Sequence, residues 1–167
     1  MRSLTLKELV LNHLEYTFER EAWQPSLSMA IEGLEASGAA WKPAPGRHSI
    51  WQVVRHVTHW KQATLGAWDG SRPLYDAATG PTDAYRETDR TDWAVVSGDG
   101  GAWRIDCEAL HAVSRAIAER ARATSEAGFM RPFPGEDMPA AERLVRMATH
   151  DIYHAGQIRL LRALQNI

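Results

Sequence analysis

Residues 149–158, near the C-terminus, read Thr149-His150-Asp151-Ile152-Tyr153-His154-Ala155-Gly156-Gln157-Ile158. This stretch lies within residues 140–164, a run of strong helix formers with no proline and only one glycine, so we expect one long helix there. Residues four apart on a helix lie one above the other on the same face, which places His150 beside His154. Two imidazoles in that arrangement can bind one metal ion, but a transition metal needs a third ligand from elsewhere in the chain.

Helical periodicity also predicts which way these two histidines point. They fall in a strip roughly 80° wide whose other members are apolar, namely Met147, Ile158 and Leu161. Such a strip should face the protein interior, and two buried histidines one turn apart are costly unless something binds them. We therefore favour metal ligation over a purely structural pair.

Three further segments have the apolar spacing of amphipathic helices. They are residues 5–20, residues 50–69 after a capping serine at Ser49, and residues 102–128. The first segment is interrupted at Pro25 and continues over residues 27–36, so we expect a broken first helix. The chain shows no competing strand signal and no internal repeat. Together with the C-terminal helix, these segments predict one all-α domain over residues 1–167, a four-helix bundle.

The helix expected at residues 50–69 carries two histidines, which periodicity separates. At about 100° per residue, His56 lies beside Trp60 at the edge of an apolar stripe that also includes Lys61. His59 lies on the opposite, polar face and is expected to be solvated. A lone histidine at the edge of a stripe is usually an ordinary core residue. The histidine pair in the C-terminal helix makes His56 the preferred third ligand instead.

Composition and charge exclude several classes of protein. The 167 residues are 44% apolar and 24% charged, which is typical of a soluble globular chain. Nineteen basic and 21 acidic residues give a net charge of -2 without a basic stripe, so we expect no nucleic-acid partner. Cys107 is the only cysteine, and residues 1–20 lack the apolar run of a signal peptide or membrane span. A cytoplasmic protein with no membrane partner is therefore expected.

Residues 70–101 are rich in glycine and proline and show no sustained periodicity. A connection of that length in a compact domain usually covers or binds something, so we expect a lid over one end of the helices. Trp93 and Val95 are expected to turn inward from it. In the following helix, Cys107 is expected to be buried and unreactive, and His111 lies at the margin of the apolar stripe.

Two motifs and one loop resemble a known family. Residues 49–56 read Ser49-Ile50-Trp51-Gln52-Val53-Val54-Arg55-His56, and the second motif is residues 150–158 of the stretch quoted first. The loop is Trp-Lys-Pro at residues 41–43. Over nearly the whole chain this pattern resembles the DinB-like superfamily, also called the YfiT-like metalloenzymes.

The resemblance implies a four-helix bundle with an up-down-down-up connection. It also implies a divalent metal, which is zinc, nickel or iron in this superfamily, held by the matching histidines His56, His150 and His154. Members include thiol S-transferases that use bacillithiol, mycothiol or glutathione-like cofactors, and isomerases of related chemistry. We accordingly expect a low-molecular-weight thiol as a further cofactor, a small-molecule substrate and a homodimer.

Residues next to the proposed ligands suggest what the site does. Three neutral imidazoles leave a coordination position for water or a substrate atom, as in catalytic zinc sites. Asp151 stands where H-E-x-x-H proteases have their basic glutamate, but it is one methylene shorter and points toward the Leu144 side of the helix. We expect Asp151 to form a hydrogen bond with one of the metal-binding histidines. We do not expect the protein to be a protease. Gln157 can orient a ligand, whereas Tyr153 projects away and is expected to pack.

The leading hypothesis is a metal-dependent enzyme of small-molecule chemistry, either a thiol S-transferase or a hydrolase. No nucleophile besides the metal site is visible, so the sequence assigns no catalytic residue. Two alternatives stay open: a non-catalytic metal-binding, ligand-binding or stress-response module, and a dimeric scaffold whose exposed helix faces pair.

Overall fold

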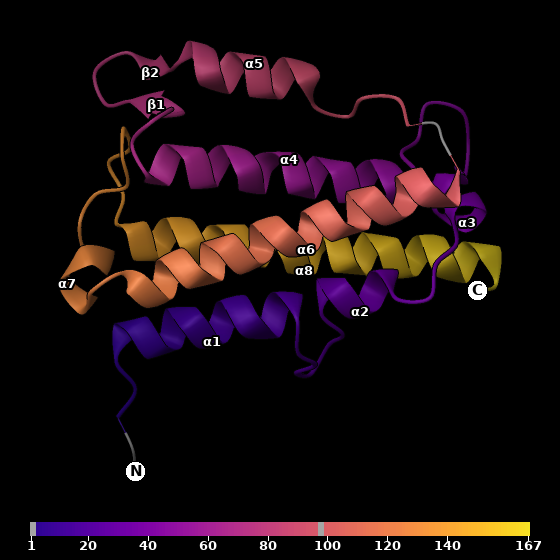
Figure 1. The fold of residues 1–167 in the computed structure, drawn as a ribbon, viewed down its shortest axis with the longest axis horizontal. Coiled ribbons are helices and arrows are strands. Elements are labelled where there is room, and N and C mark those ends of the chain that lie inside the picture. The colour runs from indigo at the N-terminus through magenta and orange to yellow at the C-terminus, as the bar shows by residue number, and fades with distance from the viewer. Residues whose placement is uncertain (1–2, 97–98) are drawn as a thin grey trace.

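The computed structural model describes residues 3–96 and 99–167 and consists mainly of helices. Four long helices lie side by side (Figure 1): α1 (Leu6–Phe18), α4 (Ile50–Trp68), α6 (Gly100–Ala123) and α8 (Ala140–Gln165). Shorter helices connect or extend them: α2 (Leu27–Ile31), α3 (Ala36–Ala40), α5 (Asp83–Thr91) and α7 (Glu126–Phe129). The prediction of an all-α bundle with a first helix broken near Pro25 is confirmed.

Side-chain caps begin the first three long helices as their sequences suggest. Thr5 and Glu8 form a reciprocal capping box at the start of α1, and Ser49 and Gln52 form another at the start of α4. Asp99 accepts hydrogen bonds from the first backbone amides of α6. Helix α8 begins after Pro139 without a side-chain cap, so its stability comes from packing along its length.

Contacts between helices set the relative directions of α4, α6 and α8. Helices α4 and α6 run the same way, because Trp51 hydrogen-bonds Asp106 and Lys61, further along α4, reaches Ser114, further along α6. Helix α8 runs opposite to α4. The Lys61 ammonium contacts Asp151, and Thr64, further along α4, is reached by the earlier α8 residue Arg143.

Two apolar clusters form the core, one toward each end of the bundle. The first includes Leu144 and Phe133, and the second includes Trp51 and Ile158. Along α4, α6 and α8 the stretch between these clusters carries buried polar side chains, namely His56, Lys61, Ser114, Asp151 and His154. A polar layer therefore crosses an otherwise apolar bundle.

The connection from residue 70 to residue 101 is more regular than its composition predicts. It contains a hairpin of two short strands, β1 (Tyr75–Asp76) and β2 (Gly80–Pro81), and then α5, which lies along α4 (Figure 1). The sequence shows no sustained period over the hairpin, because strands of two residues are too short to produce one. Residues 97 and 98, which belong to the same predicted loop, lie outside the described residues, as do residues 1 and 2.

The hairpin is held to the loop that precedes α8. At Gly135, whose φ is +79°, the backbone approaches Tyr75 so closely that an added Cβ would lie 1.7 Å from its carbonyl oxygen. Only glycine fits such an approach. The connection thus covers the α4 side of the bundle, although Val95, which was expected to point inward, is 83% exposed.

Two predicted helix boundaries also differ from those observed. The helix expected over residues 27–36 ends at Ile31, two residues before Gly33 with its left-handed φ of +71°, and a separate helix α3 begins at Ala36. The helix expected over residues 102–128 ends at Ala123, and Ser125 caps the separate α7. Local turn chemistry, which an apolar stripe does not report, ends both helices early.

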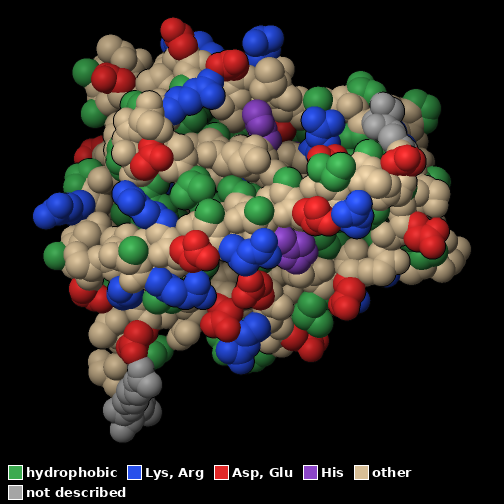
Figure 2. Space-filling model, viewed as in Figure 1, with side chains coloured by type: hydrophobic (Ala, Val, Ile, Leu, Met, Phe, Trp, Pro, Cys, Tyr) green, Lys and Arg blue, Asp and Glu red, His purple; other side chains and the backbone are tan. Residues whose placement is uncertain are grey.

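The face drawn in Figure 2 carries interspersed acidic and basic side chains, with no extended patch of one sign. Within the described residues, no helix combines the length and apolarity that crossing a bilayer demands.

Candidate metal centre

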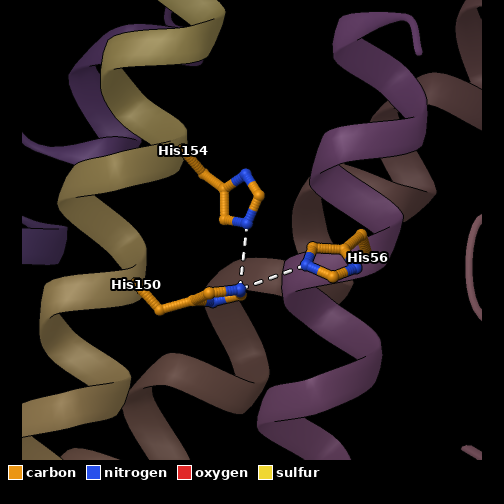
Figure 3. Close-up of side chains that lie close together, drawn as sticks. All are labelled: His56, His150 and His154. Carbon is orange, nitrogen blue, oxygen red and sulfur yellow. Dashed lines mark hydrogen bonds between the residues drawn. The ribbon is translucent and has the colours of Figure 1, made fainter. Parts of the chain in front are cut away.

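Three histidines from two helices converge in the polar layer (Figure 3). His56 comes from α4, and His150 and His154 come from α8. The Nε2 atom of His150 lies 3.1 Å from Nε2 of His56 and 2.9 Å from Nε2 of His154. All three potential ligand atoms lie within 4.8 Å of one another. The structure therefore brings together the three residues that the sequence predicted as ligands.

Hydrogen bonds from the opposite ring nitrogens set the tautomers of two of these histidines. Nδ1 of His56 donates to the carboxylate of Asp92 at 2.8 Å, and Nδ1 of His154 donates to Oε1 of Gln157 at 2.7 Å. With its proton on Nδ1, each neutral ring presents a lone pair at Nε2, which is the form that binds a metal. Both lone pairs are directed at the same point, next to Nε2 of His150.

Burial keeps the cluster uncharged at neutral pH. Desolvation, followed by repulsion from a neighbouring histidine, lowers the pKa of His150 to about 4 and that of His154 to about 3. Burial also lowers the pKa of His56, although the hydrogen bond that His56 donates to Asp92 opposes the shift. Neutral imidazole is the state that coordinates, so no proton has to be removed before a cation binds.

Asp92 is the partner that sequence reasoning missed. It follows α5 directly, and its carboxylate accepts hydrogen bonds from His56 and from Nε1 of Trp60 at 2.8 Å. The next residue, Trp93, stacks on the His56 ring with centroids 4.1 Å apart and has a left-handed φ of 58°. Gln52 donates to the carbonyl oxygen of Trp93 at 3.2 Å and helps to hold this strained turn.

Asp151 does not contact a ligand histidine, which corrects the expectation from its sequence position. Its Oδ2 accepts a 2.6 Å hydrogen bond from Lys61, whose ammonium also donates to Ser114 at 2.9 Å. Both members of this ion pair are almost wholly buried. Asp151 leaves α8 on the side of its core neighbour Leu144, so the direction expected from the helix is right and only the partner was missed.

Three other residues around the site were predicted from periodicity with mixed results. Gln157 orients His154 as expected. Tyr153 packs as expected, with the edge of its ring against His154 at a centroid distance of 5.0 Å, although its side chain is 61% exposed. His59 does point away from the cluster, but it is half-buried rather than fully solvated, and its Nε2 donates to the carbonyl of Thr88 on α5 at 2.9 Å. Periodicity could not foresee that α5 would cover this face of α4.

Cys107 and His111 lie on α6 and take no part in the cluster. The Cys107 thiol is half-buried, and desolvation raises its pKa to about 12, so it is a poor nucleophile as expected. His111 makes an edge contact with Phe18, with ring centroids 5.3 Å apart.

Open space reaches the histidine cluster from two sides. A cavity of about 400 Å³ is lined by His56 and His150 together with Trp60, Thr64, Arg143 and Met147. A smaller one of about 170 Å³ lies on the other side of His56, beside Asp92 and Trp93. A small molecule can thus approach the ligand atoms, as a catalytic metal site requires.

The residues present fit a divalent transition metal. Each of the two ring nitrogens directed at His150 is a lone-pair donor, and the three Nε2 atoms lie as close together as ligands of one small ion must. Three neutral nitrogen donors suit zinc, nickel or iron and do not suit calcium or magnesium, which prefer oxygen.

The fold and the site together define a helical bundle with a three-histidine cluster compatible with metal binding. Residues 20–158 match the model of the DinB superfamily, and the chain therefore belongs to that superfamily. A comparison with curated proteins gave no match, and neither did a comparison with solved structures.

Proposed function

We propose that this protein is a metal-dependent enzyme of small-molecule chemistry and that its reaction is thiol transfer. One observation carries the proposal: lone-pair donors held by Asp92 and Gln157 converge beside a cavity of about 400 Å³ that two of the three histidines line. When bound, a divalent ion would supply Lewis-acid chemistry and lower the pKa of a thiol or water beside it.

The hydrogen bonds and ion pairs of the nearby carboxylates favour thiol transfer over hydrolysis. Activating water is helped by a base that accepts its proton. Asp92 is engaged by His56 and Trp60. Asp151 is bound by Lys61 through Oδ2, and although its buried Oδ1 has no hydrogen-bond partner among the described residues, Asp151 does not line the larger cavity. Among the described residues that line the larger cavity, the remaining carboxylate, Asp89, is exposed. A thiol needs only a lowered pKa to become a nucleophile, and this site can provide it. The thiol S-transferases known in the DinB superfamily also support this choice.

The protein's own residues position and shield the reactants in this proposal. Trp93 covers one face of His56, and Trp60 lines the cavity while its indole nitrogen holds Asp92. These aromatic side chains exclude water from the ligand nitrogens and leave the cavity side open. The site therefore combines a fixed set of donors with restricted solvent access.

A thiol-conjugation assay tests the proposal directly. Protein loaded with zinc, nickel or iron is incubated with a panel of low-molecular-weight thiols and 1-chloro-2,4-dinitrobenzene, and thioether formation is followed by absorbance. We expect turnover that a chelator abolishes and added metal restores. The His150→Ala variant should be inactive, and His111→Ala should serve as an active control on a neighbouring helix.

The same experiment separates the competing functions. Tight binding of a thiol without turnover would favour a non-catalytic binding module. Chelator-sensitive cleavage of ester or amide substrates without thiol transfer would favour a hydrolase. If light scattering shows a dimer and the metal-loaded protein neither binds nor converts these compounds, the scaffold hypothesis gains support.

A further inference from the structure

The larger cavity beside the histidine cluster contains a cation whose hydrogen-bonding capacity is mostly unused. Arg143, Met147 and His150 follow one another at intervals of four and three residues, so they share one face of α8 and all line this cavity. From α4, the cavity is lined by His56, Trp60 and Thr64. Arg143 and two of the three histidines, His56 and His150, thus line the same cavity.

Few protein atoms accept hydrogen bonds from Arg143. Its guanidinium lies 5.7 Å from the centroid of the Phe133 ring, its Nη2 donates one long bond of 3.3 Å to Thr64, and its Nε forms an ion pair with Oε1 of Glu136 at 3.5 Å. Both of these last two atoms are buried without a hydrogen-bond partner among the described residues. A guanidinium has five N–H donors in a planar fork. Arg143 therefore keeps most of its donors available for a ligand in the cavity.

Other charged groups lining the cavity are already committed or exposed. Lys61 is bound by Asp151 and Ser114, and Asp92 is bound by His56 and Trp60. Arg146 pairs with Glu142 at the surface. Among the described residues that line the cavity, Arg143 is thus the cation whose N–H donors are mostly unused. Its side chain is only 20% exposed, so an anion that reaches it leaves most of its water behind.

The surroundings of Arg143 favour a singly charged anion. Glu136 lies beside it, and Asp89 and Asp92 line the same cavity, so a doubly charged phosphate would meet more repulsion than a carboxylate. A carboxylate also matches the planar fork of the guanidinium. Trp60 and Met147 line the space between the two ends and suit an apolar spacer.

We infer that Arg143 binds the carboxylate of an elongated small-molecule ligand whose other end reaches the histidine cluster. Seven residues separate Arg143 from His150, which corresponds to about 10 Å along the helix axis. The ligand therefore carries a carboxylate at one end, an apolar middle and a reactive group at the other. Because it identifies that reactive end with the thiol or its acceptor, the inference rests on the proposed function.

A homologous series of thiols measures this carboxylate site. Zinc-loaded protein is titrated calorimetrically with ω-mercaptoalkanoates of increasing chain length and with the mercaptoalkanols of equal length. At one optimal chain length, the carboxylates should bind about tenfold more tightly than the alcohols of equal length. A hydrogen bond to a charged group contributes free energy of that order. Equal affinity of the acids and the alcohols at every length would overturn the inference.

Three variants tie the preference to Arg143. Arg143→Gln should remove the difference between acids and alcohols while leaving alcohol binding unchanged. Glu136→Gln should tighten only the acids, because it removes the competing carboxylate. Arg146→Gln is the matched control on the same helix and should keep the preference. Where Arg143→Gln fails to fold, the Arg143→Gln/Glu136→Gln double variant replaces it, since no buried carboxylate is then left unpaired.

A second pair of assays identifies which reactant carries the carboxylate. One pairs a carboxylate-bearing thiol with a neutral electrophile, and the other pairs a neutral thiol with a carboxylate-bearing electrophile. Arg143→Gln should raise KM for the acidic reactant in only one of the two assays, the one in which that reactant binds to Arg143. An unchanged KM in both arms would contradict the inference even if the enzyme turns over.

Metal-free protein separates this inference from the proposed function. Octanoate should shift the indole N–H resonance of Trp60, which lines the cavity, in wild type and not in Arg143→Gln. That result supports the carboxylate site even if the metal-loaded protein shows no thiol transfer. A Trp60 signal that does not respond to octanoate, with no acid preference in the thiol series, would sink the carboxylate site and leave the metal centre intact.

Discussion

The histidine cluster and the Lys61–Asp151 pair occupy the same polar layer of the same two helices, yet they satisfy their buried groups in opposite ways. Lys61 and Asp151 carry opposite charges and bind each other at 2.6 Å, with Ser114 completing the contact. The cluster of His56, His150 and His154 brings like groups together, and burial holds them neutral. The two opposite charges neutralise each other within the protein, although Oδ1 of Asp151 keeps no hydrogen-bond partner among the described residues, whereas three converging ring nitrogens offer lone pairs that a bound cation could accept.

Substitutions of the neighbouring residues His150 and Asp151 should therefore have different consequences. Changes in the ion pair should act mainly on the free energy of unfolding, and changes in the histidine cluster should act mainly on metal binding.

Substitution of a ligand should have the largest effect. His150→Ala, His154→Ala and His56→Ala should each abolish stoichiometric binding of a divalent ion, because two imidazoles leave a transition metal half coordinated. Elemental analysis of purified protein, which should show close to one ion per wild-type chain, measures this. Full occupancy in the His150→Ala protein would contradict the site.

Breaking the ion pair should strongly destabilise the fold. Lys61→Met leaves Asp151 buried and unpaired and should lower the free energy of unfolding by about 3–5 kcal/mol. The double variant Lys61→Met/Asp151→Leu should regain most of that loss, since it removes both charges. Denaturant titration of the three proteins measures the effect. A single variant as stable as wild type would show that the pair does not hold α4 against α8.

Removal of the carboxylate behind His56 should weaken the metal site without emptying it. Asp92→Asn no longer provides an anion at Nδ1 of His56 and should lower metal affinity by about 10–100-fold. Asp106→Asn is the matched control, because Asp106 accepts from Trp51 on the same helix as His56 and does not touch the cluster. Competition with a chromogenic chelator gives the affinities, and equal losses in the two variants would exclude a specific role for Asp92.

Lowering the pH should affect the stability of the metal-free protein and that of the metal-loaded protein for different reasons. The folded pKa values of His150 and His154 lie below the ordinary 6.5, so as pH falls the unfolded chain binds protons first. Stability of the metal-free protein should therefore decline below about pH 6.5. Protons also compete with the metal, so the metal's stabilising increment should be large at about pH 8 and shrink toward pH 5. Thermal melts of both forms test this, and a flat increment would exclude these histidines as ligands.

His59 should give the smallest effect. It lies only three residues from His56, but its hydrogen bond holds the carbonyl of Thr88 on α5 and not the cluster. His59→Ala should retain stoichiometric metal and lose less affinity than Asp92→Asn, because it only loosens the helix that precedes Asp92. A loss of metal as complete as that of His56→Ala would mean that the assignment of faces on α4 is wrong.

Periodicity predicted the elements of the fold better than their connections. The long helices at residues 50–69 and 140–164 were placed to within one residue at each end, because an amphipathic stripe repeats over many turns. Residues 70–101 held a hairpin and α5 that no period revealed. Lys61 was assigned to the inward stripe despite its charge, and it is 3% exposed, but its partner could not be read from α4 alone.

Helical periodicity predicted the bundle and the juxtaposition of His150 and His154, because residues four apart share a helix face whatever surrounds them. It also indicated His56 as their companion, since the direction of a side chain on an amphipathic helix follows from the apolar stripe. No pattern in the sequence predicted that Asp92 binds His56, that Asp151 binds Lys61 or that Arg143 lines the same cavity as His56 and His150. Those contacts join segments distant in the chain, and they depend on how the connections pack, which no local pattern contains.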